Sequence, residues 1–184
     1  EAATEAKIVK MYPAHDAQPI ENAADGTDVA VICDVTAFHA EGGGQLGDIG
    51  TITAPTGVIA VNVTKKLPDG AVIMIGSVTE GTVAVGDAVT FAVDKARKMD
   101  IARNHTATHL LHAALKQVLG AHVNQAGSYV GPDRLRFDFS HFSQVTAEEL
   151  KEVEAIVNEQ VLAGKAVNIE ELPIEEAKKK GATA

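Results

Sequence analysis

Residues 103–112 have the sequence RNHTATHLLH and lie within a segment from about Asp94 to Leu119 that contains no proline or glycine. This pattern, with Gly120 as a C-terminal stop, predicts one long helix. His105 and His109 are four residues apart, so their imidazoles lie on one helix face and can reach a common point. Two ligands for one zinc ion are built in this way, although the spacing also fits a polar seam without a metal.

The residue that follows His105 narrows the chemistry. Metalloproteases of the H-E-x-x-H type place a glutamate there as the general base. This chain has Thr106 at that position, which excludes that class. A metal at this helix would need its base or its activated water from another part of the protein.

The part of the chain before the long helix has β character. Short apolar runs are separated by turn signals such as Asp25-Gly26 and Pro68-Asp69-Gly70. Many short strands at regular spacing are typical of a small barrel. We expect strands at Lys7–Met11, Val29–Val35, Gly50–Thr53, Val58–Thr64, Ala71–Ile75 and Ala88–Val93.

The part after the long helix mixes strands and helices. Its signals are a Gly-Pro-Asp turn, a capping box, a second glycine stop and a proline at a helix start. We expect a hairpin at residues 122–140 with its turn at 131–133, a helix from Thr146 to about Ala163, a strand at Val167–Leu172 and a short helix from Pro173.

These patterns predict the α+β fold class with two domains. The period of the apolar residues changes near Asp94, so we place a β-barrel-like domain at residues 1–93 and a two-layer α+β domain at 94–184. The two are expected to form separate lobes that meet at the histidine helix.

The composition sets limits on function and location. The chain has 184 residues, 46% of them hydrophobic, which is enough for a real core. A formal net charge of −9 argues against gripping nucleic acid by bulk electrostatics, although local basic groups exist. No apolar run approaches the roughly 20 residues of a membrane span. The single cysteine, Cys33, excludes an internal disulfide and fits a reducing cytoplasm.

A second unusual stretch, TAFHAEGGGQLGDIG, occupies residues 36–50. Three consecutive glycines mark a place where the backbone turns sharply or approaches another group closely. Exposed amides of such a loop can hold a carbonyl or phosphate oxygen. A hairpin loop without function is the alternative. Gly-Gly-Gln also occurs in peptide release factors, but three residues are too few to support that function.

The chain resembles the editing region of alanyl-tRNA synthetases and the free-standing alanyl-tRNA editing proteins. The resemblance covers nearly the whole sequence, and the Gly-Gly-Gln segment favours this branch over the related editing domain of threonyl-tRNA synthetases. The matching motifs lie in family order at Thr36–Gly50, Asn104–Leu111, Leu119–Ser128 and Leu135–His141.

The resemblance implies a fold and an activity. The second half would be an editing domain of the threonyl/alanyl-tRNA synthetase second additional domain type. The activity would be hydrolysis of mischarged Ser-tRNA(Ala) and Gly-tRNA(Ala) by an ATP-binding alanine–tRNA ligase of the cytoplasm. Its partners would be the acceptor end of tRNA(Ala) and the rest of the parent synthetase, with no membrane. The alternatives are a catalytically inactive tRNA-binding module and a zinc-dependent hydrolase of another ester or amide.

The resemblance also implies a zinc ion, with His105 and His109 as two of its ligands. In the family a later Cys-x-x-x-His motif completes the site, and the sequence to Ala184 contains no such motif. The chain also begins at Glu1 without an initiator Met. We therefore expect an excised fragment of a larger synthetase, in which the zinc site is incomplete and zinc binds weakly or is absent.

Further site residues are carried over from the matching motifs. Gln125 is expected to contact the side chain of the wrong amino acid, because its amide can pair with a serine hydroxyl; the alternative is a strand residue that faces water. The glycine-rich loop is expected near the terminal adenosine or the ester, with Asp48 bracing it. His39 stands where many relatives carry tyrosine. The predicted catalytic residues are Gln125, Gly43, Gly44 and Gln45, and the predicted substrate-binding residues are Gln125, Gly42, Gly43, Thr106 and Arg136.

Overall fold

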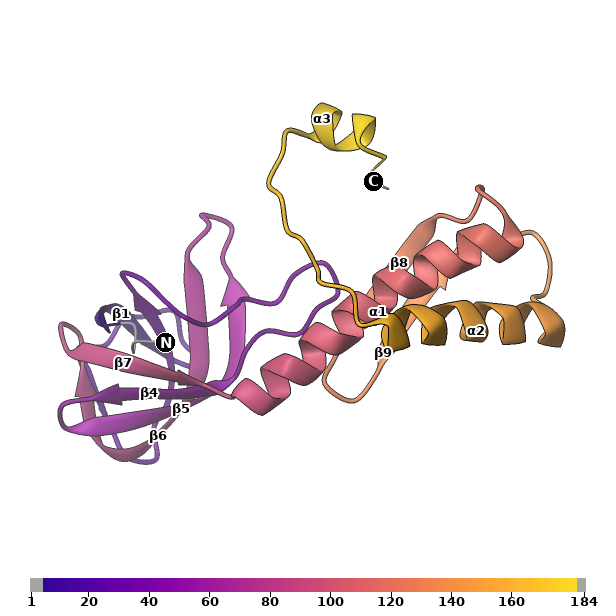
Figure 1. The fold of residues 1–184 in the computed structure, drawn as a ribbon. Coiled ribbons are helices and arrows are strands. Elements are labelled where there is room, and N and C mark those ends of the chain that lie inside the picture. The colour runs from indigo at the N-terminus through magenta and orange to yellow at the C-terminus, as the bar shows by residue number, and fades with distance from the viewer. Residues whose placement is uncertain (1–4, 182–184) are drawn as a thin grey trace.

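The structure, a computed structural model, describes residues 5–181, and its first half is a closed β-barrel (Figure 1). Neighbouring strands follow the antiparallel order β6-β3-β1-β7-β4-β5, and β5 pairs again with β6, which closes a ring of six strands. The short strand β2 pairs with the second half of β6. The strands are β1 (Glu5–Pro13), β2 (Asn22–Ala24), β3 (Asp28–Cys33), β4 (Gly50–Ala54), β5 (Gly57–Lys66), β6 (Val72–Ala84) and β7 (Ala88–Val93).

Alternation of apolar and polar residues along the strands fills the barrel. In β5, Gly57, Ile59 and Val61 are buried at alternate positions, as expected for a strand with one face inward. In β1 the register shifts between Ile8 and Lys10, so Ile8 and Met11 both point inward although they are three residues apart. The core contains mostly valine, isoleucine and alanine, with Phe38 and Phe91 in edge-to-face contact.

The second half packs two helices and a hairpin around a core of its own. The helix α1 (Lys95–Leu119) leaves the barrel directly after β7, and α2 (Ala147–Ala163) lies beside it. The hairpin strands β8 (Gln125–Val130) and β9 (Leu135–Phe139) both contact α1. Ala114, Leu115, Val123 and Val153 are buried at the centre of this core. A short helix, α3 (Ile174–Lys179), follows an extended segment (Figure 1).

The caps of the two long helices lie where the sequence predicts them. Asp94 accepts a hydrogen bond from the amide of Arg97, and the chain leaves α1 at Gly120. Thr146 and Glu149 form the predicted capping box of α2, which ends at Gly164 in the left-handed conformation. The α+β class and the β-barrel are confirmed. The domain boundary at Asp94 stays a prediction.

The strand predicted at Val167–Leu172 is wrong. This segment pairs with no strand among residues 5–181. Val167 and Ile169 are 68% and 91% exposed. An alternating apolar pattern becomes a strand only where a neighbouring edge supplies hydrogen bonds and a buried face, and this segment has neither.

Between residues 5 and 181, no helix is long and apolar enough to cross a bilayer.

Candidate functional site at the junction of barrel and helix

The glycine loop, residues 39–48, lies between the barrel strands β3 and β4 in the sequence and extends from the barrel to contact the second half (Figure 1). Gly42 and Gln45 exchange two backbone hydrogen bonds, of 3.1 and 3.0 Å, across a tight turn. The central residues Gly43 and Gly44 have φ values of 59° and 84°. Two consecutive positive φ angles are the pattern of a type I′ turn, which residues with a side chain adopt poorly. The run of glycines is therefore explained by the backbone conformation of this loop.

The glycine loop pairs with strand β8 of the second half. The amide of Val130 donates to the carbonyl of Gly44 at 2.8 Å, and the amide of Leu46 donates to the carbonyl of Val130 at 3.0 Å. This is a parallel bridge, with Gln45 opposite Val130. A Cβ on Gly44 would lie 2.2 Å from the carbonyl oxygen of Ser128. The loop therefore reaches its position on β8 only with glycine at residue 44.

Asp48 holds the other end of the glycine loop. Its side chain is 3% exposed, and its carboxylate accepts from the amide of His39 at 2.8 Å and from the ammonium of Lys98 at 2.7 Å. The hydroxyl of Thr64 on β5 donates to the backbone carbonyl of Asp48. In α1, Arg97 adds a hydrogen bond to the carbonyl of Gly47. These contacts fix the loop to the barrel and to the first turns of α1.

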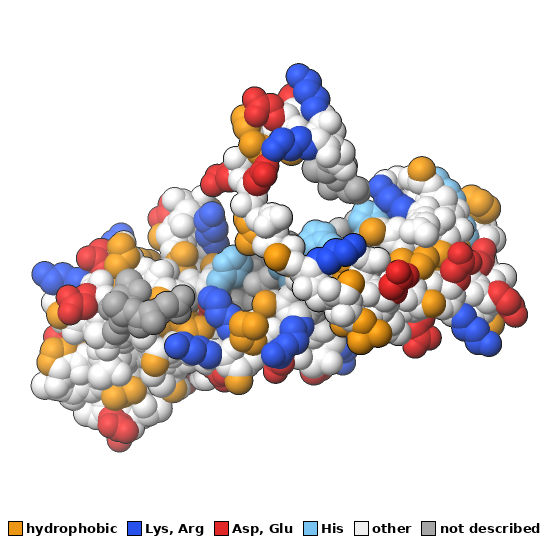
Figure 2. Space-filling view, viewed as in Figure 1, with side chains coloured by type: hydrophobic (Ala, Val, Ile, Leu, Met, Phe, Trp, Pro, Cys, Tyr) orange, Lys and Arg blue, Asp and Glu red, His pale blue; other side chains and the backbone are white. Residues whose placement is uncertain are grey.

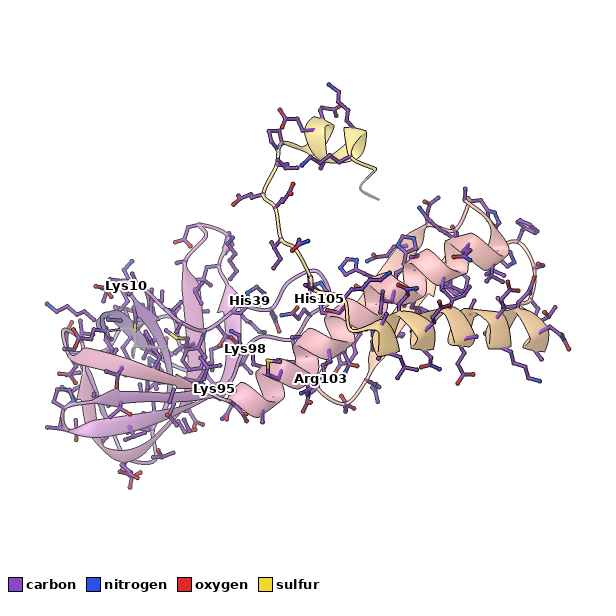
Figure 3. All side chains as sticks on the ribbon, in the orientation of Figure 1. Lys10, His39, Lys95, Lys98, Arg103 and His105 are labelled. Atoms are coloured by element: carbon purple, nitrogen blue, oxygen red, sulfur yellow. The ribbon has the colours of Figure 1, made fainter. Side chains whose placement is uncertain are left out.

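His105 and His109 stack on one face of α1. Their ring centroids are 5.2 Å apart, with an angle of 27° between the ring planes. Partial burial lowers the pKa of His105, and the nearby rings of His109 and His39 lower this pKa further. Figure 3 shows His39, from the glycine loop, beside His105. The lowered pKa favours the neutral imidazole, which is the form that binds metals.

The described residues do not supply a complete zinc site. Between residues 5 and 181, no group of three or more His, Cys, Asp and Glu side chains is placed to hold one ion. Structural and catalytic zinc sites use three or four protein ligands. The stacked pair His105 and His109 is smaller than such a set. Cys33 lies in β3 of the barrel, where burial raises the pKa of its thiol to about 12.

Gln125 lies on the side of the hairpin that faces α1. It is opposite Phe139 in the register, and Ser128 is opposite Phe137. Residues opposite each other across two strands point to the same face. The ring of Phe137 packs against the ring of His112 in α1, with 4.9 Å between the ring centroids. The structure therefore places Gln125 and Ser128 on the same side as the histidine helix.

The other predicted substrate residues fall in two places. Thr106 is exposed on α1 next to His105. Arg136 is opposite Tyr129, on the other face of the hairpin, where it pairs with Asp138 at 3.1 Å. The structure does not bring Arg136 together with Gln125 or the glycine loop. The predicted roles themselves stay predictions.

Two residues at the junction were not singled out from the sequence. Ser128 donates to the carbonyl of Gly43 at 3.0 Å and lies 3.3 Å from the amide nitrogen of Gln125. Asn104, next to His105, donates to the carbonyl of Gly131 at 2.8 Å and so ties α1 to the hairpin turn. Both belong to runs that carry the family resemblance, which is the one signal in the sequence for them.

Histidines are exposed along one side of the molecule. Figure 2 shows their side chains in pale blue from the junction with the barrel toward the far end of the second half. His122 and His141, which follow the ends of α1 and β9 in the chain, share a hydrogen bond of 2.8 Å and stack on each other, and the ring of Phe142 is tilted against both. A separate pocket, in the C-terminal segment, is lined by residues such as Asn168, Leu172 and Lys180 and contains none of the predicted site residues.

Comparisons with known proteins give consistent matches. A family model described as tRNA synthetases class II (A) matches residues 1–97. An alanine–tRNA ligase of Acetivibrio thermocellus is 52% identical over 181 residues, which cover 98% of this chain and 21% of the relative. The alanine–tRNA ligases of Bacillus velezensis and Geobacillus kaustophilus are 48% and 50% identical over 98% and 100% of this chain, each match covering 20% of the relative. The chain therefore spans about a fifth of the length of the curated relatives it matches.

Proposed function

Because this chain belongs to the class II (A) tRNA synthetase family, as part of an alanyl-tRNA synthetase, we propose that it forms the editing unit of such an enzyme. The reaction is hydrolysis of serine or glycine wrongly esterified to the acceptor end of tRNA(Ala). The observation that carries the proposal is the glycine loop, which pairs with β8 at Val130, accepts a hydrogen bond from Ser128 at Gly43 and carries His39 close to His105. The finer fold assignment, an editing domain of the threonyl/alanyl type, belongs to this proposal.

A second hydrolytic site answers a physical limit on selection. A pocket for alanine cannot exclude glycine, which is smaller, and discriminates weakly against serine, which adds one hydroxyl. Differences of this size are worth about 1–3 kcal/mol in a single binding step. Hydrolysis at a separate site, with contacts that recognise the wrong amino acid, multiplies the selectivity of the first step.

The residues at the junction have different roles in the proposed reaction. Gln125 contacts the side chain of the wrong amino acid, and the exposed turn of the glycine loop holds the ester carbonyl or the terminal ribose through backbone amides. His105 and His109 would contribute two neutral imidazoles toward a zinc ion. The two histidines alone are too few for a stable site, so such a site would need further ligands.

A second candidate function is a tRNA-contacting module without hydrolytic activity of its own. The observation that favours it is the pair of histidines without a third ligand among residues 5–181. A third candidate is hydrolysis of an ester or amide other than aminoacyl-tRNA, which the same loop and histidines would permit.

A deacylation assay separates these functions. The chain, and the whole synthetase that carries it, are mixed with Ser-tRNA(Ala), Gly-tRNA(Ala) and correctly charged Ala-tRNA(Ala), with added Zn²⁺ or with chelator. Editing predicts loss of the seryl and glycyl esters and survival of the alanyl ester. Binding to tRNA(Ala) by both proteins without loss of any ester would support the inactive module. Hydrolysis of simple esters only would support the third candidate.

Replacement of Gln125 tests the role of that residue. In the whole synthetase, Gln125→Leu removes the amide and is expected to slow Ser-tRNA(Ala) hydrolysis by about tenfold, the size of one lost hydrogen bond to the substrate. Gln117→Leu is the matched control, because Gln117 is exposed on α1. Deacylation rates that stay unchanged for both the seryl and the glycyl ester would exclude Gln125 from the site.

A further inference from the structure

A β-bulge brings Gln125 and Ser128 to the same face of β8. In a regular strand, residues three apart point to opposite faces. In β8 the register advances two residues, from Gln125 to Gly127, while β9 advances one, from Phe139 to Asp138. This insertion turns the side chain of Gln125 toward that of Ser128. Their contact therefore depends on an irregularity of the strand.

The hydrogen bonds around Ser128 have a fixed direction. The carbonyl of Gly43 can only accept, so the single hydroxyl proton of Ser128 is donated to it at 3.0 Å. The lone pairs of the same oxygen then remain to accept from a donor. The amide nitrogen of Gln125 lies 3.3 Å away and supplies that donor. The opposite amide orientation would set the carbonyl oxygen of Gln125 against an oxygen that has no proton left to give.

Resting on the proposed editing function, we propose that Ser128 is a positioning residue that sets the specificity of the site. By holding the amide nitrogen of Gln125, it presents the carbonyl oxygen of that amide to the substrate. This oxygen accepts the side-chain hydroxyl of a seryl ester. A glycyl ester has no side-chain hydroxyl and gains nothing from the orientation. The link to Gly43 also makes the orientation conditional on docking of the glycine loop.

The variant Ser128→Ala tests this inference through a ratio. It removes the acceptor for the Gln125 amide, which can then rotate. We expect kcat/KM for Ser-tRNA(Ala) to fall about fivefold, the usual effect of one net hydrogen bond between neutral groups, with Gly-tRNA(Ala) hydrolysis unchanged. Ser128→Thr keeps the hydroxyl and should restore part of the seryl activity. Ser77→Ala, a serine of the barrel strand β6, is the matched control.

A merely structural role predicts a different result. If Ser128 only anchored the loop, Ser128→Ala would lower kcat/KM for both esters by the same factor. It would also speed hydrogen exchange at the amide of Val130, which donates to the carbonyl of Gly44. An equal fall for both esters, or an unchanged ratio in an active enzyme, overturns the positioning role. If the unmodified synthetase hydrolyses neither ester, the editing function itself fails, and the specificity inference fails with it.

Discussion

At Gly44 two separate requirements exclude a side chain. Its φ of 84° lies in the left-handed region, and a Cβ there would lie 2.2 Å from the carbonyl oxygen of Ser128. The two preceding glycines are less restricted. Gly43 has a φ of 59° with open space around it, and Gly42 has neither restriction. The three glycines therefore form a graded series in which conformation and space can be separated.

Alanine at each glycine should produce graded effects. Gly42→Ala is expected to be nearly neutral, and Gly43→Ala to weaken the docked loop by about 1–2 kcal/mol through its left-handed backbone. Gly44→Ala adds the clash with Ser128 and should undock the loop. Hydrogen exchange at the amides of Leu46 and Val130 measures the effect. Equal protection in all three variants would show that the loop does not need this turn.

The thiol of Cys33 should be inert in the folded barrel. Burial and the adjacent carboxylate of Asp34 raise its pKa from 9.0 to about 12. Each unit lowers the thiolate fraction tenfold at a given pH, so near pH 8 alkylation should be roughly a thousandfold slower than in the unfolded chain. Because the folded pKa is raised, ionisation of Cys33 should destabilise the fold as pH rises above about 9. Rapid labelling at pH 8 without denaturant would contradict this.

The sequence predicts some of these residues better than others. The position of His105 and His109 on one helix face follows from their spacing of four residues. The glycine turn follows from the scarcity of other residues at positive φ. Ser128 cannot be found in this way, because its role depends on a register shift in β8 and on a partner 85 residues away. Arg136 looks suitable as a basic residue, but the pairing of β9 turns it to the other face of the hairpin.

At the scale of elements, local signals predict the helices well and the last strand badly. The helix α2 begins at a capping box and ends at a left-handed glycine, and each of these features depends only on a few adjacent residues. A strand depends on a partner, which no local pattern supplies. The segment Val167–Leu172 alternates suitably and still remains unpaired among the described residues.

The capping box of α2 gives a prediction for stability. Thr146→Ala should lower the free energy of unfolding by about 1 kcal/mol, because the amide of Glu149 loses its acceptor. Thr146→Ser keeps the oxygen and serves as the control. Backbone hydrogen bonding lowers the pKa of Glu149, so its contribution is present above its ordinary pKa and lost as pH falls through the lowered value. Chemical denaturation at neutral and acidic pH measures both effects.

At the scale of the whole molecule, two apolar cores lie on either side of the junction. One fills the barrel and the other lies between α1, α2 and the hairpin. The glycine loop and the pair Asp48–Lys98 connect the two parts. Each part has its own buried apolar centre, so we expect neither to require a metal ion to fold.

Zinc removal should therefore leave the fold intact. We expect the purified chain to hold zinc weakly, through His105 and His109, and to release it to chelator without change in its circular dichroism or melting temperature. Acidification should weaken binding, because protonated imidazoles cannot coordinate a metal. His105→Ala should abolish the residual affinity in calorimetric titration, and His15→Ala is the control. One zinc ion per chain after exhaustive chelation would reveal ligands that the two histidines do not account for.

The hydrogen bond between Ser128 and Gly43 joins residues 85 positions apart, and this separation sets an order of assembly. All the strands of the barrel precede β8 in the chain, so the barrel can close before the partner of its glycine loop has been synthesised. At about 5–20 residues per second, translation of the 35 residues from Val93, the end of β7, to Ser128 takes roughly 2–7 s. During that interval the nascent chain carries a finished barrel whose glycine loop still lacks its partner strand. The proposed hydrolysis would then become available only after the hairpin has emerged and the loop has docked.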